Sequence, residues 1–300
     1  QAFTDGVVLR THLLRPTWHF VVPADIRWLL ALTAPRVHAA NAYWYRKLEL
    51  DDALFKRIHS TLAKALEGGK HLTRTQLATE LQQVGVRTDG ELRLSYIMMH
   101  AELEGLICSG GRDGKQFTYA LLDERVPPAK PLTPDEALAE LTLRYFTSRG
   151  PALLKDYAGW SGLTMTSARA GLEMVKSQLS HEVIDGETYW FAEAAPPIVP
   201  PSPTVYLLPN YDEYVSSYKD HTPISDPQFT DKWDAARNVV LAHYIVLDGK
   251  IIGTWQRTLK KREVLIETSL FRPLTAAEQQ AFAAAAQRYA DYLGLTLVLP

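Results

Sequence analysis

Two stretches of this sequence have the same order of predicted elements, three helices followed by a β-hairpin, and this repeat restricts the fold more than any other feature. In the first stretch, apolar residues recur every four positions from Leu54 to Leu66, which predicts a helix that ends at Gly68-Gly69. Thr73 is placed to cap a shorter second helix, which Gly85 stops. The chain is therefore expected to contain small helical modules, each closed by a hairpin.

The third helix and the hairpin complete the first module. A helix fits residues 91–103, and a strand at 106–108, a glycine-rich turn at 109–115 and a strand at 117–121 follow it. Three helices and a hairpin within about 70 residues is the winged-helix order, in which the third helix can enter the major groove of DNA. A module that serves only packing or dimerisation is the alternative.

Basic side chains of this module are placed to contact a duplex. The hairpin turn carries Arg112 and Lys115, which would reach phosphates, and Arg93 lies near the start of the third helix. The net charge is +3 for residues 1–122 and −5 for residues 123–300, although the whole chain is close to neutral at −2. We therefore expect a polyanion such as double-stranded DNA to bind the first segment preferentially.

The second stretch repeats this order after a proline-rich linker at 127–131. Helices fit residues 134–147, 153–159 and 164–178, and a tight hairpin around Asp185-Gly186 follows them. The tip of this hairpin has no Lys or Arg, so a packing role explains the second module as well as DNA contact does.

The two ends of the chain contain the remaining strands. Two strands fit residues 7–14 and 15–22, and a helix fits residues 23–35. Because strands need neighbouring strands to pair with, we expect part of this domain to precede Gln1. Beyond a second proline-rich linker, the patterns predict strands at 205–208, 239–247, 251–257 and 263–270. A helix at 275–293 is predicted to cover the sheet that they form.

These patterns predict an α+β fold with tandem winged-helix modules and a C-terminal β-rich domain. The predicted domains are 1–50, the remainder of an N-terminal winged-helix unit with its connecting helix; 51–126 and 132–195, the two complete units; and 204–300, a sheet with its helix.

Several classes of protein are disfavoured by what the sequence lacks. The single cysteine, Cys108, excludes an internal disulfide and a cysteine-rich metal site. The sequence has no Gly-Lys-Ser/Thr phosphate loop, no Gly-x-Ser-x-Gly elbow and no His-Glu-x-x-His motif, and we predict no cofactor and no metal. No apolar stretch approaches the roughly 20 residues of a membrane span, so we expect a cytoplasmic protein, with a monomer favoured.

The densest polar group lies on the two N-terminal strands. His12, Arg15, Thr17 and His19 follow Arg10 there, interleaved with apolar residues. Several imidazole and guanidinium groups can converge if the strands pair, and such groups hold a phosphate or orient a water. Two histidines at a surface edge, with satisfied hydrogen bonds, are the alternative.

Two further groups lie near the C-terminus. Asn210 and Asp212 follow a strand, where a carboxylate can act as a base or stabilise a cationic sugar, although an Asx turn with a helix cap explains them equally well. We predict that they share a cleft with the N-terminal group. Lys260, Lys261 and Arg262 near a hairpin end are candidate phosphate contacts, and a solvated turn is the commoner explanation.

Five ordered segments resemble the bacterial winged-helix DNA-binding superfamily that includes the alkylated-base and interstrand-cross-link DNA glycosylases. They are RTHLLRPTWHFV at 10–21, MHAEL at 99–103, GKQFTY at 114–119, LLPNYDEY at 207–214 and GTW at 253–255. The resemblance implies tandem winged helices around a DNA-accommodating cleft and a role in DNA repair.

The resemblance also implies a catalytic Gln-x-Gln or Gln-x-Asp pair upstream of the first segment, and nothing before Arg10 matches it. We therefore expect a further small helical segment before Gln1, and little or no release of damaged bases by these 300 residues alone. The alternatives to a DNA glycosylase are a DNA-binding regulator without catalysis and a protein-interaction scaffold.

Overall fold

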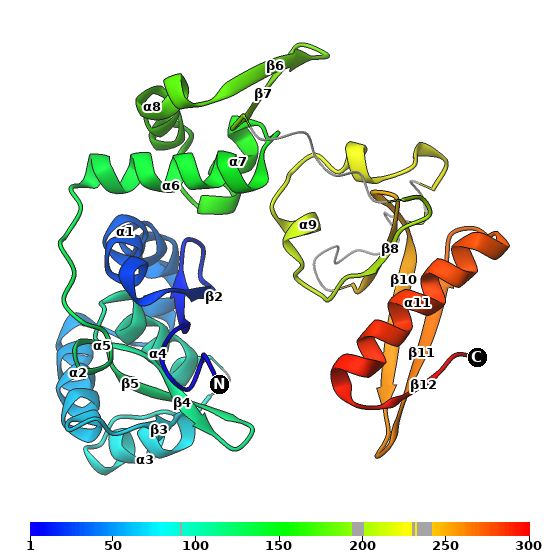
Figure 1. Ribbon diagram of the computed structural model, residues 1–300. Coiled ribbons are helices and arrows are strands. Elements are labelled where there is room, and N and C mark those ends of the chain that lie inside the picture. The colour runs from blue at the N-terminus through cyan, green and yellow to red at the C-terminus, as the bar shows by residue number, and fades with distance from the viewer. Residues whose placement is uncertain (91, 194–200, 230–231, 233–241) are drawn as a thin grey trace. The chain divides into compact units, whose positions relative to one another are not determined.

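The computed structural model describes all residues except 91, 194–200, 230–231 and 233–241 (Figure 1). The described residues form two compact units, Gln1–Phe191 and Ala192–Pro300. Both units mix helices with small sheets, which confirms the predicted α+β class. None of the described helices combines the length and the apolar character that a membrane span requires.

The first unit begins with an antiparallel hairpin of β1 (Leu9–Leu13) and β2 (Thr17–Val21), followed by α1 (Pro23–Lys47). The prediction that this helix ends at Pro35 is wrong, because α1 continues for 12 residues beyond it. Its buried stripe runs through Leu30, Ala34 and Val37, on both sides of the proline. We infer that this packing outweighs the cost of about 3 kcal/mol that a proline imposes inside a helix.

The next elements are the three helices and the hairpin that the first repeat predicts, with one short strand, β3, that the sequence patterns did not predict. They are α2 (Asp52–Leu66), β3 (Leu72–Thr73), α3 (Arg74–Gln83), α4 (Arg93–Leu103), β4 (Ile107–Asp113) and β5 (Gln116–Leu121). The predicted turn at 109–115 is too long: a bulge between Ser109 and Arg112 absorbs the two glycines there, and the strands meet at Gly114 and Lys115. The sheet has the order β3-β5-β4.

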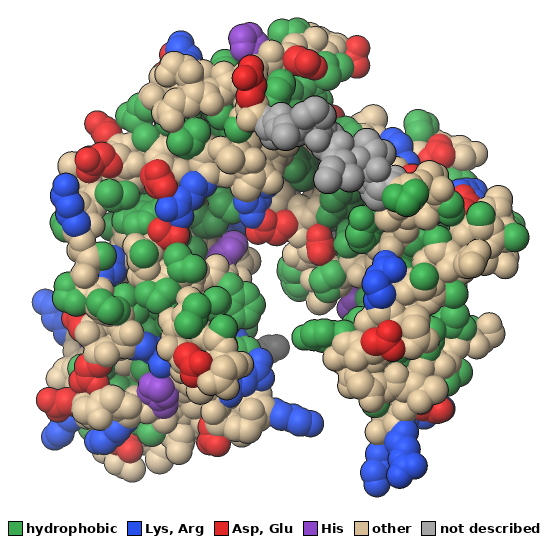
Figure 2. All heavy atoms as spheres, in the orientation of Figure 1, with side chains coloured by type: hydrophobic (Ala, Val, Ile, Leu, Met, Phe, Trp, Pro, Cys, Tyr) green, Lys and Arg blue, Asp and Glu red, His purple; other side chains and the backbone are tan. Residues whose placement is uncertain are grey.

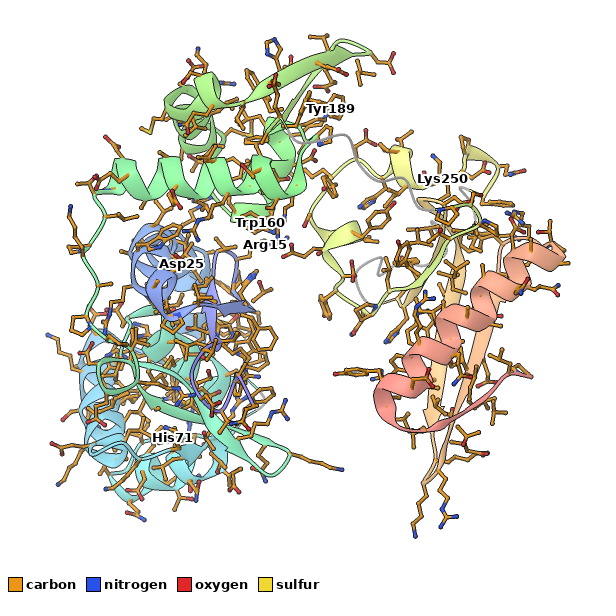
Figure 3. The ribbon with its side chains drawn as sticks, viewed as in Figure 1. Arg15, Asp25, His71, Trp160, Tyr189 and Lys250 are labelled. Atoms are coloured by element: carbon orange, nitrogen blue, oxygen red, sulfur yellow. The ribbon has the colours of Figure 1, made fainter. Side chains whose placement is uncertain are left out.

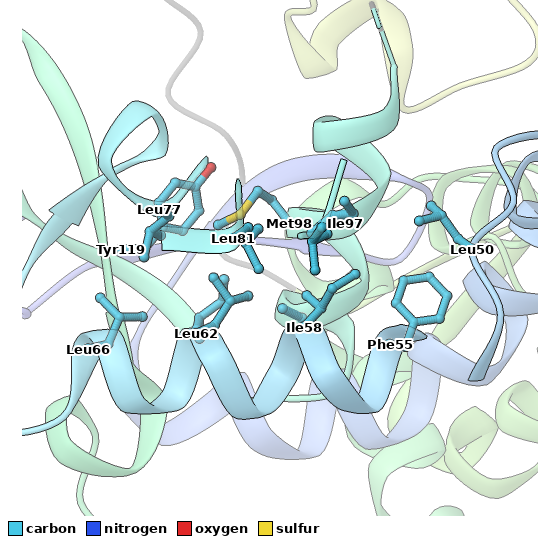
Figure 4. Close-up of a cluster of buried hydrophobic side chains, with 13 residues drawn as sticks. Leu50, Phe55, Ile58, Leu62, Leu66, Leu77, Leu81, Ile97, Met98 and Tyr119 are labelled. Atoms are coloured by element: carbon cyan, nitrogen blue, oxygen red, sulfur yellow. The ribbon is translucent and has the colours of Figure 1, made fainter. Parts of the chain in front are cut away.

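One apolar core holds these elements together (Figure 4). One face of α2 presents side chains that meet others from α3, α4 and β5. The fully buried members include Ile58, Leu62, Leu66, Leu77, Leu81 and Ile97. Thr73 forms the expected capping box with Gln76, which fixes the start of α3.

A short α5 (Leu122–Arg125) leads to the second repeat. Its elements are α6 (Pro134–Arg149), α7 (Leu154–Ser161), α8 (Met165–Val175) with a 3-10 turn η1 (Lys176–Gln178), β6 (Ser180–Ile184) and β7 (Glu187–Phe191). Asp185 and Gly186 form the predicted turn, both with positive φ. The α6 helix packs on α1, and so joins the two repeats in one unit.

The second unit contains a five-stranded sheet of described residues in the order β12-β11-β10-β9-β8. Its elements are β8 (Val205–Leu207), α9 (Glu213–Ser216), the turns η2 (Thr222–Ile224) and η3 (Pro227–Phe229), β9 (Tyr244–Leu247), β10 (Lys250–Leu259), β11 (Glu263–Leu270), α11 (Ala276–Leu293) and β12 (Thr296–Val298). Residues 239–241 of the predicted second strand lie outside the described residues. Alanines of α11 pack on the sheet beside Trp255 and Val264.

Candidate nucleic-acid interface

A stack of alternating arginine and aromatic side chains crosses the joined hairpins of the first unit. The guanidinium carbon of Arg10 lies 4.4 Å from the ring centre of Trp18 and 3.6 Å from that of Phe117. Arg112 lies 4.1 Å from the ring centre of Phe117. We call Trp18, Arg10, Phe117 and Arg112 the arginine–aromatic ladder. Each cation faces a ring, an arrangement that is favourable and that orders the long arginine side chains.

The ladder ends in solvent-exposed groups. Trp18 is 49% exposed, and neighbouring Phe20 is 67% exposed. Phe3 joins the two hairpins through edge-on contacts with Phe20 and Phe117, at 6.2 and 5.4 Å between ring centres. Large exposed aromatic side chains beside arginines suit a polyanion whose bases can stack.

The β4–β5 hairpin carries the ladder's outer cation to its tip. Arg112 and Lys115 are both exposed, and Arg112 donates to the carbonyl oxygen of Lys115 at 3.2 Å. Figure 2 shows basic side chains projecting at this tip. Contact of Arg112 and Lys115 with phosphates stays a prediction.

His12 lies under the ladder as half of a buried pair. Its Nδ1 forms a close contact with Glu102 Oε2, from α4; His12 is 7% exposed and Glu102 is 0% exposed. The ring of His12 also packs on Trp18, 4.9 Å between ring centres. The pairing register places His12 opposite Trp18, and His19 opposite Thr11. His12 and His19 therefore lie on opposite faces of this hairpin, because neighbouring positions on a strand face opposite sides. Their convergence with Arg15 and Thr17 on one cleft stays a prediction.

His19 belongs to a second group on the other face of this hairpin. Its Nε2 lies 2.9 Å from the hydroxyl oxygen of Thr17. Burial lowers the pKa of His19 to about 4, with further lowering by Arg15 and Arg149, so the ring is neutral at neutral pH. We call Thr17, His19, Arg15 and Arg149 the His19 group. Two cations beside a neutral imidazole favour an anionic ligand such as a phosphate.

The second repeat helps to position the His19 group. Arg149 lies over the ring of Trp160, 4.4 Å from its centre, and Arg15 packs against Gly162, where a methyl group would lie 3.4 Å from the Arg15 side chain. Figure 3 shows Arg15 and Trp160 next to each other. The end of α7 thus supports cations from two elements far apart in sequence.

The structure does not place Arg93 where it could contact DNA, contrary to the prediction from the sequence. Its guanidinium donates to the carbonyl oxygen of Arg87 at 2.8 Å and to that of Leu48, and the residue is only 5% exposed. A guanidinium held by two backbone carbonyls inside the unit cannot reach a phosphate. Arg93 instead ties the start of α4 to the loops before α2 and α4.

Replacing Arg93 with Met is therefore expected to lower the free energy of unfolding by about 1–3 kcal/mol, because the carbonyl groups of Arg87 and Leu48 lose a charged hydrogen-bond donor. Urea unfolding would measure the loss, and the affinity of the folded variant for duplex DNA should not change. If the Arg93→Met variant has normal stability but binds DNA more weakly, Arg93 contacts DNA and this assignment is wrong.

The polar groups of the second unit are built as local structure. Asp212 accepts a hydrogen bond from the backbone nitrogen of Tyr214 at 2.8 Å and caps α9, as the helix-cap alternative predicts; Asn210 is exposed. Lys260 pairs with Glu263 at 2.6 Å in the turn between β10 and β11, and Lys261 and Arg262 are exposed beside it. A cleft shared with the N-terminal group would join different units and stays a prediction.

The sequence patterns missed the partners that assemble the ladder. Glu102, Trp18 and Phe117 all fall inside segments that carried the resemblance, at 99–103, 10–21 and 114–119. Those three segments meet in space through the His12–Glu102 pair and the stack on Arg10. The presence of these three segments in this order was the sequence feature that could have indicated the group. The spacing of residues within each segment does not reveal the contacts between segments.

Comparison with known proteins identifies the family of this chain. Residues 1–292 match the family described as "DNA glycosylase AlkZ-like", and the chain belongs to that family. The resemblance inferred from the five segments is thereby confirmed. The solved structure of Streptomyces sahachiroi DNA glycosylase AlkZ is similar in fold, with a TM-score of 0.75 at 20% identity, over 99% of this chain and 82% of that one. No curated protein matches this sequence.

Proposed function

We propose that this chain binds double-stranded DNA and takes part in removing alkylated or cross-linked bases. The arginine–aromatic ladder, placed beside a hairpin tip with two exposed cations, is the observation that carries the proposal. We further propose that its two helix–hairpin repeats are tandem winged helices. Membership of the AlkZ-like family supports both proposals.

The two ends of the ladder fit different parts of a nucleic acid. Arg112 and Lys115 carry the positive charge that phosphates attract, and this term makes affinity dependent on salt. Trp18 and Phe20 offer flat apolar surfaces on which a base displaced from the duplex can stack. A damaged base, already weakly paired, is the least costly to displace.

The proposed chemistry is hydrolysis of the bond between the base and C1′ of the sugar. Alkylation makes the base cationic, so the bonding electrons leave with the base, and the base departs neutral without an acid. Water forms the new bond to C1′ and releases one proton to the surrounding water. The remaining requirement is an oriented water. The Thr17–His19 pair is a neutral polar pair placed to orient this water, whereas the sequence contains neither Gln-x-Gln nor Gln-x-Asp.

That absence favours a second candidate, a DNA-binding protein without catalysis. Release of N7-methylguanine from duplex DNA separates the two candidates. Release that Thr17→Ala and His19→Gln both abolish, with DNA binding retained, would support catalysis through this pair. Salt-sensitive binding without release is what the missing glutamine pair leads us to expect of these 300 residues, and it would favour the non-catalytic candidate.

Replacing both Arg112 and Lys115 with Ala is expected to reduce the slope of log affinity against log salt by up to about two, whatever the duplex sequence. The reason is the loss of two phosphate contacts. Fluorescence anisotropy at several salt concentrations measures it. The control is Lys56→Ala with Lys64→Ala, which removes the same charge from exposed positions on α2. Equal slopes for both double variants would contradict the proposed hairpin contact.

A further inference from the structure

Three histidines from three different helices lie close to a glutamate in the first unit. They are separate from the arginine–aromatic ladder and from the His19 group. His38 lies on α1, His59 on α2 and His100 on α4, while Glu104 directly follows α4. None of the sequence motifs indicated this group, because only His100 and Glu104 are close in sequence.

Ligand atoms of His38, His100 and Glu104 lie close together, and His59 lies beside His100. His38 Nε2 lies 3.0 Å from Glu104 Oε1, and His59 Nε2 lies 3.1 Å from His100 Nδ1. One ligand atom each from His38, His100 and Glu104 lie within 4.8 Å of one another. Tetrahedral bonds of 2.0–2.2 Å put neighbouring donors roughly 3.3 Å apart, so small side-chain rotations close the set.

The three histidines are partly buried. Burial lowers the pKa of His38, of His59 and of His100. A neutral imidazole is the form of histidine that binds metals.

A second layer of contacts orients the donors. Tyr45 Oη lies 2.9 Å from His38 Nδ1, and Asn41 donates to the same oxygen at 3.4 Å. Holding Nδ1 in this way aims Nε2 of His38 at the group, as supporting residues do in metal sites. The ring of His100 stacks on Phe55, 3.5 Å between ring centres.

An ion can reach the group from solvent. His38, His100 and Glu104 line an open cavity of about 780 Å³, whose wall also carries Asp51 and Asp52. These carboxylates raise the local concentration of cations. Glu104 is 49% exposed, so it can turn toward an entering ion.

We propose that His38, His100 and Glu104 bind a divalent transition-metal ion of the Zn²⁺ class, with His59 as the fourth donor. Two or three imidazoles with one carboxylate form a donor set that zinc takes in proteins. The ion would tie α1, α2 and α4 together around the first repeat. This site does not depend on the proposed function, and it is an alternative to the prediction of no metal that the titration below tests.

The test is titration of the chelator-stripped whole chain with Zn²⁺, by calorimetry and by competition with a chelating dye. We expect one ion per chain. The variants His38→Gln and Glu104→Gln should bind at least roughly 100-fold more weakly, and Tyr45→Phe about 10-fold more weakly. His71→Gln, which changes a histidine outside the group, should bind as the natural chain does.

Two results would overturn the site. One is no uptake of Zn²⁺ by the stripped chain; the other is equal affinity in the natural chain and in His38→Gln and Glu104→Gln. Should either variant fail to fold, the natural chain and Tyr45→Phe decide the question. Added Zn²⁺ must raise the melting temperature of the natural chain, and a higher concentration must be needed for Tyr45→Phe.

Discussion

Replacing His12 with Ala is expected to lower the free energy of unfolding by about 3–5 kcal/mol, the largest effect of any single change considered for this chain. Among the described residues, the substitution removes the side chain that pairs with the Glu102 carboxylate, and Glu102 is 0% exposed. The other carboxylate oxygen, Oε1, already has no hydrogen-bond partner among the described residues. Arg10 acts on this carboxylate only through its charge.

Urea unfolding measures this loss, and a paired variant separates the buried charge from simple packing. His12→Leu together with Glu102→Leu should be markedly more stable than His12→Ala, because no polar group is then left buried without a partner. If His12→Ala costs less than about 1 kcal/mol, the pair does not hold the hairpin on α4, and the ladder above it lacks the support described.

The second large effect is a loss of stability in mild acid. The pKa of His19 is about 4 in the folded chain, against 6.5 when unfolded, so between these values the unfolded chain binds more protons. Stability due to His19 is thus complete above about pH 6.5 and falls as pH decreases, by about 1.4 kcal/mol per unit, until the ring is protonated near pH 4.

The free energy of unfolding between pH 7 and 4 tests this expectation. In His19→Gln, the free energy of unfolding should change less steeply with pH in this range, by an amount that corresponds to about one bound proton. The glutamine keeps a polar partner for Thr17. His181→Gln, which changes a histidine on an exposed strand, is the control and should leave the slope unchanged. An unaltered slope in His19→Gln would mean that the pKa of His19 is the same in the folded and the unfolded chain, which would contradict the expectation.

Local patterns predicted most of the elements because their signals are local. Thr73, Thr133 and Thr275 each form a capping box with the residue three positions on, and Asp185-Gly186 makes the turn of its hairpin. Such signals depend on a few neighbouring residues and are readable in a single sequence. The short strands β3 and β12 were not predicted, because two or three residues show too little alternation to indicate a strand.

Contacts between distant segments were not predictable in this way. His12 and Glu102 are 90 positions apart, and α1 runs through Pro35 only because other elements pack on it. The burial of Arg93 likewise depends on carbonyl groups of two loops. The residue types of the candidate interface could be read from the sequence, but their partners depend on the tertiary fold.

The most direct test of the account is photo-crosslinking of the whole chain to duplex DNA that carries one N7-methylguanine, with identification of the linked peptides. The account predicts links to Trp18, Phe20 or Phe117, and their loss with rising salt, since phosphate contacts hold the duplex in place. Salt-insensitive links confined to residues 192–300, or no links to a duplex at low salt, would contradict it.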